Sequence, residues 1–460
     1  MEKTWGTVKI SKYIEEGFID VLDPKRRLGN WDSNDKSDAV EMVANKLFVD
    51  EPEEIRISEV FRRAFGVDLI LNRSRSGGAF HIGDRKKLPP HKKRLTPDFL
   101  KFIRNLPLVS AQGSGMRSFA RIALQILTSW KSVVVIDEPE LFLHPPQVRH
   151  LARLIASDAN PQMQLFIATH NENFVRGVLD VDNERVTVIR LSRSGDQGDY
   201  AVLNSDDIKA LWEDPLFRTS NVLSALFHDG ALLLEGESDV RFLQTLMGTI
   251  YGNERLPDVG YYSCNGKSKI GHIAKALRGV KVPVLAVVDL DIFRNRTEFL
   301  SLFETLGGDP STVAADVAAI SNAVEQKKNF LTGRQFLSEI DLINANIDPK
   351  QPVPESAVGS IRELLKRTSP WVRVKQDGVR GLNDADATQA FRRVFQAGAD
   401  HGLLVIAEGE LEGFCRSISR TNKSEWLSEV LKRDLVEDPD LKDAREFAHA
   451  LKMTFEKVVG

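Results

Sequence analysis

The chain has 460 residues, about three times the usual length of one domain, so we expect at least two domains. Its 62 basic and 65 acidic residues give a formal net charge of −3, which by itself does not favour a nucleic-acid or membrane partner. With 42% hydrophobic and 28% charged residues, the composition excludes a disordered, collagen-like or coiled-coil chain. The two cysteines, Cys264 and Cys415, are too few for a disulfide framework or a four-cysteine zinc site, which fits a reducing compartment.

The N-terminal segment carries Glu2, Glu15 and Glu16 and lacks the apolar stretch of a secretion signal. The longest apolar runs, such as residues 133–136 and 284–288, have the length of strands and are followed by carboxylates. We therefore expect a cytoplasmic protein without a membrane partner.

Residues 1–70 mix short alternating stretches, at 7–10 and 55–57, with charged helix-like segments, and this pattern does not identify a fold. Residues 73–104 contain ten lysines and arginines against two aspartates, a local charge of +8. Frequent glycine and proline predict a loop or hairpin there. The charge makes the segment a candidate DNA-tracking surface, with a solvated loop or a site for an acidic partner as alternatives.

From residue 116 onward, amphipathic helices alternate with apolar strands. Strands are predicted at residues 133–136, 164–168, 231–234, 261–264, 284–288 and 403–406. This alternation predicts an α/β fold with two mostly parallel sheets. We place the joint between them near residues 211–230 and expect mainly helices and loops at 295–400.

Two adjacent carboxylates, Asp137 and Glu138, follow the strand at 133–136. Open α/β sheets bind their ligands at this end of the strands. In nucleoside triphosphatases the first acid holds magnesium and the second activates the attacking water. The alternative is a solvated turn after a strand.

Two flanking segments favour the nucleotide interpretation. Ser114 and Gly115 directly precede a predicted helix, where backbone N–H groups can face a phosphate. His170 follows the strand at 164–168 and is expected at the same sheet edge as Asp137 and Glu138. Taken singly, a tight turn and a capping histidine are the plainer interpretations, but their order and spacing favour a site.

The run IDEPELFLHPP at residues 136–146, with Ser114, Gly115 and His170, resembles the ABC-type ATPase head of the overcoming lysogenization defect (OLD) family. The resemblance covers about residues 110–176. It implies a degenerate signature loop at Ser114 and Gly115, magnesium binding by Asp137, and catalytic roles for Glu138 and His170.

A family head also has a phosphate loop of the type GxxxxGK[ST], and residues 1–110 contain none. The single GKS, residues 266–268, lies in the second predicted sheet, where a glycine turn is the plainer interpretation. The resemblance therefore implies that ATP binding needs a phosphate loop from outside this sequence: either the reading frame lacks the start of the head, or another chain supplies the loop. We expect a homo-oligomer, or a partner chain that carries the loop.

A second group of acids follows later strands: Glu235, Asp239, Asp289 and Asp291. In an extended chain, residues two apart face the same way, so we expect Asp289 and Asp291 to point at one ion. Carboxylate oxygens suit Mg²⁺ or Mn²⁺, and two such ions stabilise the attacking and leaving oxygens of a phosphodiester. The alternatives are a favourable charge at a helix start for Asp239 and solvated loops for Asp289 and Asp291.

Together these four acids resemble the metal site of the TOPRIM domain, which the OLD family fuses to the ATPase head. The resemblance implies an incomplete head at residues 1–220 and a Rossmann-like TOPRIM domain at 221–460, with a helical insertion at about 295–400. It also implies that Glu412, in a late acidic segment, adds a metal ligand. Glu408 and Glu410 compete for that role, and Lys452 and Lys432 are candidates for a supporting lysine.

We therefore expect a Mg²⁺- or Mn²⁺-dependent DNA endonuclease or nickase regulated by an ABC-type ATPase head. A role in defence against phages follows from the resemblance. A primase-like or topoisomerase-like enzyme is disfavoured, because Tyr261 and Tyr262 lie in an apolar strand and are expected in the core. The missing phosphate loop keeps a third hypothesis open, a catalytically incomplete subunit that binds DNA or a partner ATPase.

Overall fold

The structure is a computed structural model, and it describes residues 19–22, 47, 50–72, 79–88, 96–128, 132–181, 185–194, 196–203, 221–325, 333–366, 370–382, 384–420 and 422–460. The chain divides into two compact units, Met1–Val188 with Asn204–Arg218, and Ile189–Leu203 with Thr219–Gly460. Residues 189–203 thus group with the second unit, although they precede the boundary expected from the sequence.

Residues 189–203 contain most of an antiparallel pair, β6 (Val188–Ser194) and β7 (Gln197–Leu203). Arg190 anchors this pair by donating to the carbonyl oxygens of Leu226 and His228.

The first unit contains a parallel sheet in the order β1 (Ile19–Leu22), β4 (Val133–Asp137) and β5 (Gln164–Ala168). Val134 and Ile136 are fully buried because alternate side chains of β4 face the helices. The core helices are α3 (Glu51–Phe65), α5 (Ser114–Thr128), α6 (Pro145–Asp158) and α7 (Glu172–Leu179). Both strands predicted here, 133–136 and 164–168, are confirmed.

A small antiparallel pair, β2 (Asp68–Asn72) and β3 (Ala79–Gly83), precedes the helix α4 (Pro97–Arg104). The expectation of loop or hairpin over residues 73–104 is therefore wrong for α4. This helix forms because Thr96 caps it and because Phe99 and Ile103 are buried on one face.

Residues 55–57, where apolar and charged side chains alternate in the sequence, lie inside α3. Asp50 caps this helix, and Ile57 and Phe61 recur at helical spacing on its buried face. The stretch at residues 7–10 lies outside the described residues.

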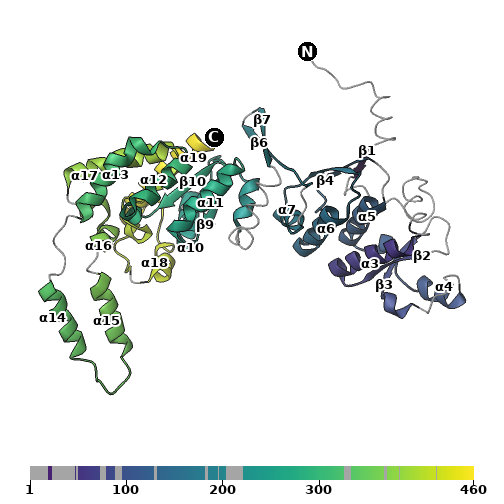
Figure 1. Cartoon of the computed structure of the whole chain (residues 1–460), viewed down its shortest axis with the longest axis horizontal. Helices are drawn as coiled ribbons and strands as arrows, with labels where there is room; N and C mark the ends of the chain where they lie inside the picture. Colours follow the sequence, from purple (N-terminus) through teal and green to yellow (C-terminus); the bar gives the residue numbers. More distant parts are fainter. Residues whose placement is uncertain are drawn as a thin grey trace, which may run out of the picture. The chain divides into compact units, whose positions relative to one another are not determined.

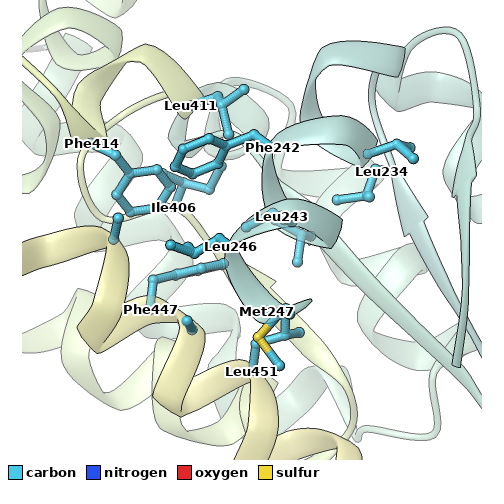
Figure 2. Close-up of a cluster of buried hydrophobic side chains, with 14 of the residues drawn as sticks. Leu234, Phe242, Leu243, Leu246, Met247, Ile406, Leu411, Phe414, Phe447 and Leu451 are labelled. Atoms are coloured by element: carbon cyan, nitrogen blue, oxygen red, sulfur yellow. The ribbon is translucent and has the colours of Figure 1, made fainter. Parts of the chain in front are cut away.

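The second unit contains a parallel sheet in the order β11 (Leu403–Val405), β10 (Val284–Val288), β8 (Gly230–Leu234) and β9 (Val259–Ser263). Every residue of β8 and β10 is buried, as expected for parallel strands covered on both faces. Helices α10 (Glu237–Tyr251), α11 (Lys267–Gly279), α18 (Lys423–Val430) and α19 (Lys442–Val458) accompany the sheet. Figure 2 shows Phe242 and Leu246 of α10 packed near Phe414 and Phe447 in the core of this unit.

A helical insertion separates β10 from β11, as the sequence predicts. It consists of α12 (Arg296–Thr305), α13 (Pro310–Glu325), α14 (Gly333–Asn344), α15 (Glu355–Lys366), α16 (Pro370–Asp377) and α17 (Ala385–Asp400). Arg393 binds both oxygens of Asp316 and joins α17 to α13. Helices α14 and α15 lie side by side (Figure 1), and Leu337 and Leu342 on α14 are exposed.

Within the described part of the chain, the structure contains no helix that is both long and apolar enough to cross a membrane.

Candidate functional site

Three carboxylates meet at the carboxyl ends of two neighbouring strands in the second unit. Glu235 follows β8, and Asp289 and Asp291 follow β10, which pairs with β8 in parallel. One oxygen from each of the three lies within 4.8 Å of the others. The backbone N–H of Asp289 donates to Glu235 Oε1 at 3.2 Å, which fixes the two residues relative to each other. The structure thus brings together three of the four acids that the sequence places after these strands.

The local geometry of the aspartate pair differs from the expected extended chain. β10 ends at Val288, and Asp289 is the N-cap of a 3₁₀ helix, η4 (Leu290–Arg294), which contains Asp291. The expectation that the pleat of a strand aligns the two side chains is therefore wrong. A tight helical turn brings Asp291 to the cluster.

Asp239 lies in the first turn of α10 and is 3% exposed. Its Oδ2 accepts from the backbone N–H of Gly236 at 2.7 Å, and its Oδ1 pairs with Lys423 Nζ at 3.0 Å. A favourable charge at the start of α10 therefore accounts for Oδ2 of Asp239, whereas Oδ1 forms an ion pair. Its negative charge acts to raise the pKa of Asp289, so it lies close to the three-acid cluster without being part of it.

Glu412, in the short helix η6 (Leu411–Phe414), is 5% exposed. Its Oε2 is buried and has no hydrogen-bond partner among the described residues. Burying an unpartnered carboxylate oxygen is costly, so this atom is suited to receive a cation. Glu410 instead pairs with Lys375 at 3.5 Å, and burial raises the pKa of Glu408 to about 7.

Lysines face the acids of this site, each at ion-pair distance. Lys375 Nζ lies 2.9 Å from Asp289 Oδ2, and Lys267 Nζ lies 2.9 Å from Asp291 Oδ1. Lys375 comes from the helical insertion and Lys423 from α18, and sequence reasoning missed both because no local motif links them to the acids. The two lysines that the sequence suggested differ from these: Lys452 pairs with Glu254, and Lys432 is exposed.

The electrostatics of the cluster favour a cation. Burial, followed by the charge of Asp289, raises the pKa of Glu235 to about 7. Burial also raises the pKa of Asp289 to about 6, and the ammonium of Lys375 opposes this rise. A divalent ion relieves such crowding of desolvated carboxylates, and hard oxygen donors are the ligands that Mg²⁺ and Mn²⁺ prefer. The residues present therefore fit a metal site.

A second set of polar residues gathers at the carboxyl ends of β4 and β5 in the first unit. Asp137 ends β4, and Glu138 follows it with a positive φ of 47°. His170 Nδ1 lies 3.5 Å from Glu138 Oε1 and 3.6 Å from Glu140 Oε1. Glu140, for which the sequence suggested no role, is 6% exposed.

Ser114 and Gly115 begin α5, and Gly115 approaches the loop that follows β4. A Cβ added to Gly115 would lie 2.5 Å from the carbonyl oxygen of Phe142, so only glycine permits this approach. The predicted signature loop therefore contacts the segment between the paired carboxylates and α6.

The tyrosines of β9 are core residues. Tyr262 is 6% exposed and its hydroxyl lies 2.9 Å from Ser224 Oγ, while Tyr261 packs edge-on against Phe455. Burial raises the pKa of Tyr261, which makes it a poor nucleophile. Cys264 and Cys415 are both buried.

Comparison with known families matches both units. Residues 45–176 match a family described as "AAA domain, putative AbiEii toxin, Type IV TA system". Residues 226–291 match "Overcoming lysogenization defect protein-like, TOPRIM domain", a segment that contains Glu235, Asp239, Asp289 and Asp291.

Two curated relatives carry nuclease names. The Old nuclease of Escherichia phage P2 is 22% identical over 183 residues, which are 38% of this chain and 30% of that protein. The OLD nuclease of Thermus scotoductus is 28% identical over 171 residues, 35% of this chain and 31% of the relative. The matches thus span less than a third of each relative. The chain combines an AAA-type ATPase-like domain with an OLD-like TOPRIM domain, which is the architecture of the OLD family.

Proposed function

We propose that this chain is a divalent-metal-dependent endonuclease or nickase that acts on DNA. The observation that carries the proposal is the cluster of Glu235, Asp289 and Asp291, whose oxygens lie within 4.8 Å of one another at the ends of adjacent strands. The TOPRIM match and the names of the two relatives support a nuclease.

Glu235, Asp289 and Asp291 would hold one Mg²⁺ or Mn²⁺ ion, and Glu412 and Asp239 would add ligands for a second. When bound, such ions polarise the phosphodiester and lower the pKa of the attacking water. Lys267 lies at the start of α11 beside Asp291, where its ammonium can orient a DNA phosphate.

A plasmid-nicking assay with Mg²⁺ or Mn²⁺ tests this proposal. Asp289→Ala and Glu235→Ala should abolish nicking and leave DNA binding largely intact, because each removes a metal ligand. The matched control is Glu237→Ala, which removes an exposed acid of α10 that forms an ion pair with Arg241. Full nicking by purified Asp289→Ala protein, free of contaminating nuclease, would overturn the assignment.

We also propose that the first unit is a regulatory ATPase head that binds ATP with a phosphate loop from a partner chain that carries one. Asp137 would hold magnesium, Glu138 would activate water, His170 would sense the γ-phosphate, and Ser114 and Gly115 would close over the nucleotide. The phosphates need a cradle of backbone N–H groups and a lysine, and residues 1–110 contain no GxxxxGK[ST].

The isolated chain should therefore show negligible ATPase activity. Activity should appear when a loop-bearing fragment is added, and Glu138→Gln should remove it. Robust turnover by the chain alone, abolished by Glu138→Gln, would contradict the need for an outside loop. The same absent motif favours a second candidate function, a catalytically incomplete DNA- or partner-binding subunit, and the nicking assay separates the two.

We further propose that the chain acts in the cytoplasm in defence against phages, because it has the OLD architecture. Plaque formation on cells that express the chain tests it, with Glu235→Ala as the inactive comparison. Equal plaque numbers for the two proteins would argue against a defence role of the metal centre.

A further inference from the structure

Lys375 is supplied to the acidic cluster by the helical insertion, and not by the sheet that carries the acids. It lies near the end of α16, and its Nζ is 2.9 Å from Asp289 Oδ2 and 3.5 Å from Glu410 Oε2. Asp289 is the most buried member of the three-acid cluster, with 5% of its surface exposed. The insertion therefore places a positive charge on a central carboxylate of the candidate metal site.

The end of α16 is held against the site by close backbone approaches. Gly409 has a φ of +100°, and a Cβ there would lie 2.1 Å from the carbonyl oxygen of Lys375. The carbonyl oxygen of Gly409 accepts a hydrogen bond at 2.9 Å from the backbone N–H of Leu290, the residue that follows Asp289. One glycine thus connects the residue that carries the ammonium to the turn that carries the carboxylate.

Further contacts fix the same helix end. Arg420 donates to the carbonyl oxygen of Gln376 at 2.6 Å, and Arg416 donates to that of Asp377 at 3.1 Å. Val379 donates its backbone N–H to the carbonyl oxygen of Ala407 at 2.8 Å. The position of Lys375 is consequently set by the backbone around it, and its ion pair with Asp289 is not a contact between two freely moving surface side chains.

We propose that the ammonium of Lys375 competes with the divalent ion for the carboxylate of Asp289. In the metal-free chain, Lys375 forms an ion pair with this carboxylate. The proposal rests on the proposed function, in which Asp289 is a metal ligand. An ammonium and a divalent ion that share one carboxylate repel each other, and low solvation strengthens that repulsion. Lys375 therefore weakens metal binding. Because Lys375 belongs to the helical insertion, the insertion sets the metal affinity of the site.

The test measures Mn²⁺ binding to the full chain by calorimetry, without DNA or nucleotide. Lys375→Met should bind Mn²⁺ about tenfold tighter than the unmodified chain, because the competing charge is gone. Lys350→Met, at an exposed lysine between α14 and α15, makes the same change of charge away from the acids and should leave the affinity unchanged. In an Asp289→Asn background, Lys375→Met should produce no such gain, since the shared carboxylate is absent.

Thermal melting of the metal-free proteins checks that the variants are folded. Lys375→Gln retains a hydrogen-bond donor without the charge, and it replaces the methionine variant if that protein does not fold. Unchanged or weaker Mn²⁺ binding by a folded, uncharged variant would overturn the role of Lys375, while Mn²⁺ binding by the unmodified chain would leave the metal site standing. Failure of both the unmodified chain and the Lys375 variants to bind Mn²⁺ would overturn the metal site itself, and the inference with it.

Discussion

Glu140 Oε1 accepts a hydrogen bond from Thr169 Oγ1 at 2.7 Å and another from the backbone N–H of His170 at 3.3 Å. Glu140 thus connects the loop that follows β4 to the residues that follow β5. It holds the backbone of the predicted switch histidine, whose side chain is 71% exposed and close to Glu138. Glu140 is therefore a residue that positions others at this edge.

Glu140→Ala should lower the free energy of unfolding of the first unit by about 1–3 kcal/mol, because it removes the carboxylate that accepts these two partly buried hydrogen bonds. Urea unfolding with a probe confined to this unit measures the change. Glu59→Ala removes an exposed glutamate of α3 and should shift the same transition by less than about 0.5 kcal/mol. Equal effects of the two substitutions would show that the hydrogen bonds of Glu140 contribute nothing.

Asp180, at the end of α7, accepts hydrogen bonds from Arg149 at 2.6 and 2.8 Å and from Arg153 at 2.7 Å. Burial acts to raise the pKa of Asp180, but the two arginines outweigh it and the net shift is downward. A lowered folded-state pKa gives stability that is present above the unfolded value near 4 and is lost as the pH falls through the folded value.

Asp180→Asn should therefore reduce the unfolding free energy at pH 7 by about 1 kcal/mol, with the difference shrinking below about pH 4. Denaturant titrations at several pH values measure this. A difference that stays constant down to about pH 2 would contradict the electrostatic origin of the effect.

Glu235 should make the metal-free chain less stable as the pH rises. Its folded-state pKa is raised to about 7, chiefly by burial, so its contribution is fully present below the unfolded value near 4.5 and is lost as the pH rises through 7. Glu235→Gln removes this titration and should flatten the pH dependence of the unfolding free energy, measured in chelator. Identical pH profiles for the two proteins would rule out a buried, titrating Glu235.

Gly409→Ala should disrupt the attachment of α16, because the new Cβ would meet the carbonyl oxygen of Lys375 at a positive φ. We expect the stability of the second unit to fall by at least about 2 kcal/mol. Gly359→Ala is the matched control: no atom lies within 4 Å of the added Cβ, and the exposed position in α15 should gain about 0.5–1 kcal/mol. An unchanged free energy of unfolding for Gly409→Ala would mean that α16 can shift away from Gly409 without a loss of stability.

The basic segment at residues 73–104 is predicted to bind the DNA backbone. Lys86 and Lys87 are exposed, whereas Arg85 pairs with the buried Glu54; Arg73, Arg75, Lys92, Lys93 and Arg94 lie outside the described residues. Neutralising Lys86, Lys87, Lys92 and Lys93 together should flatten the fall of DNA affinity with salt, because a surface with fewer lysines displaces fewer counterions from the DNA. An unchanged slope of log affinity against log salt would exclude this surface.

The sequence by itself determined the alternation of helices with strands β4, β5, β8, β9, β10 and β11, and the carboxylates at the ends of β4, β8 and β10; it did not predict β1 or the order of the strands across either sheet. These features are local: an apolar run of strand length ending in acids needs no distant partner to be identified. For the same reason the core role of Tyr261 and Tyr262 could be predicted from their strand alone.

Only the tertiary structure decided which side chains complete each site. Lys375 reaches Asp289 from the helical insertion and Lys423 reaches Asp239 from α18, and both ion pairs depend on packing between elements far apart in the chain. The 3₁₀ turn at Asp289 likewise replaces the extended geometry that the spacing of the two aspartates suggested. Such pairs leave no periodic signal in the sequence, because the partners share neither a strand nor a helix face.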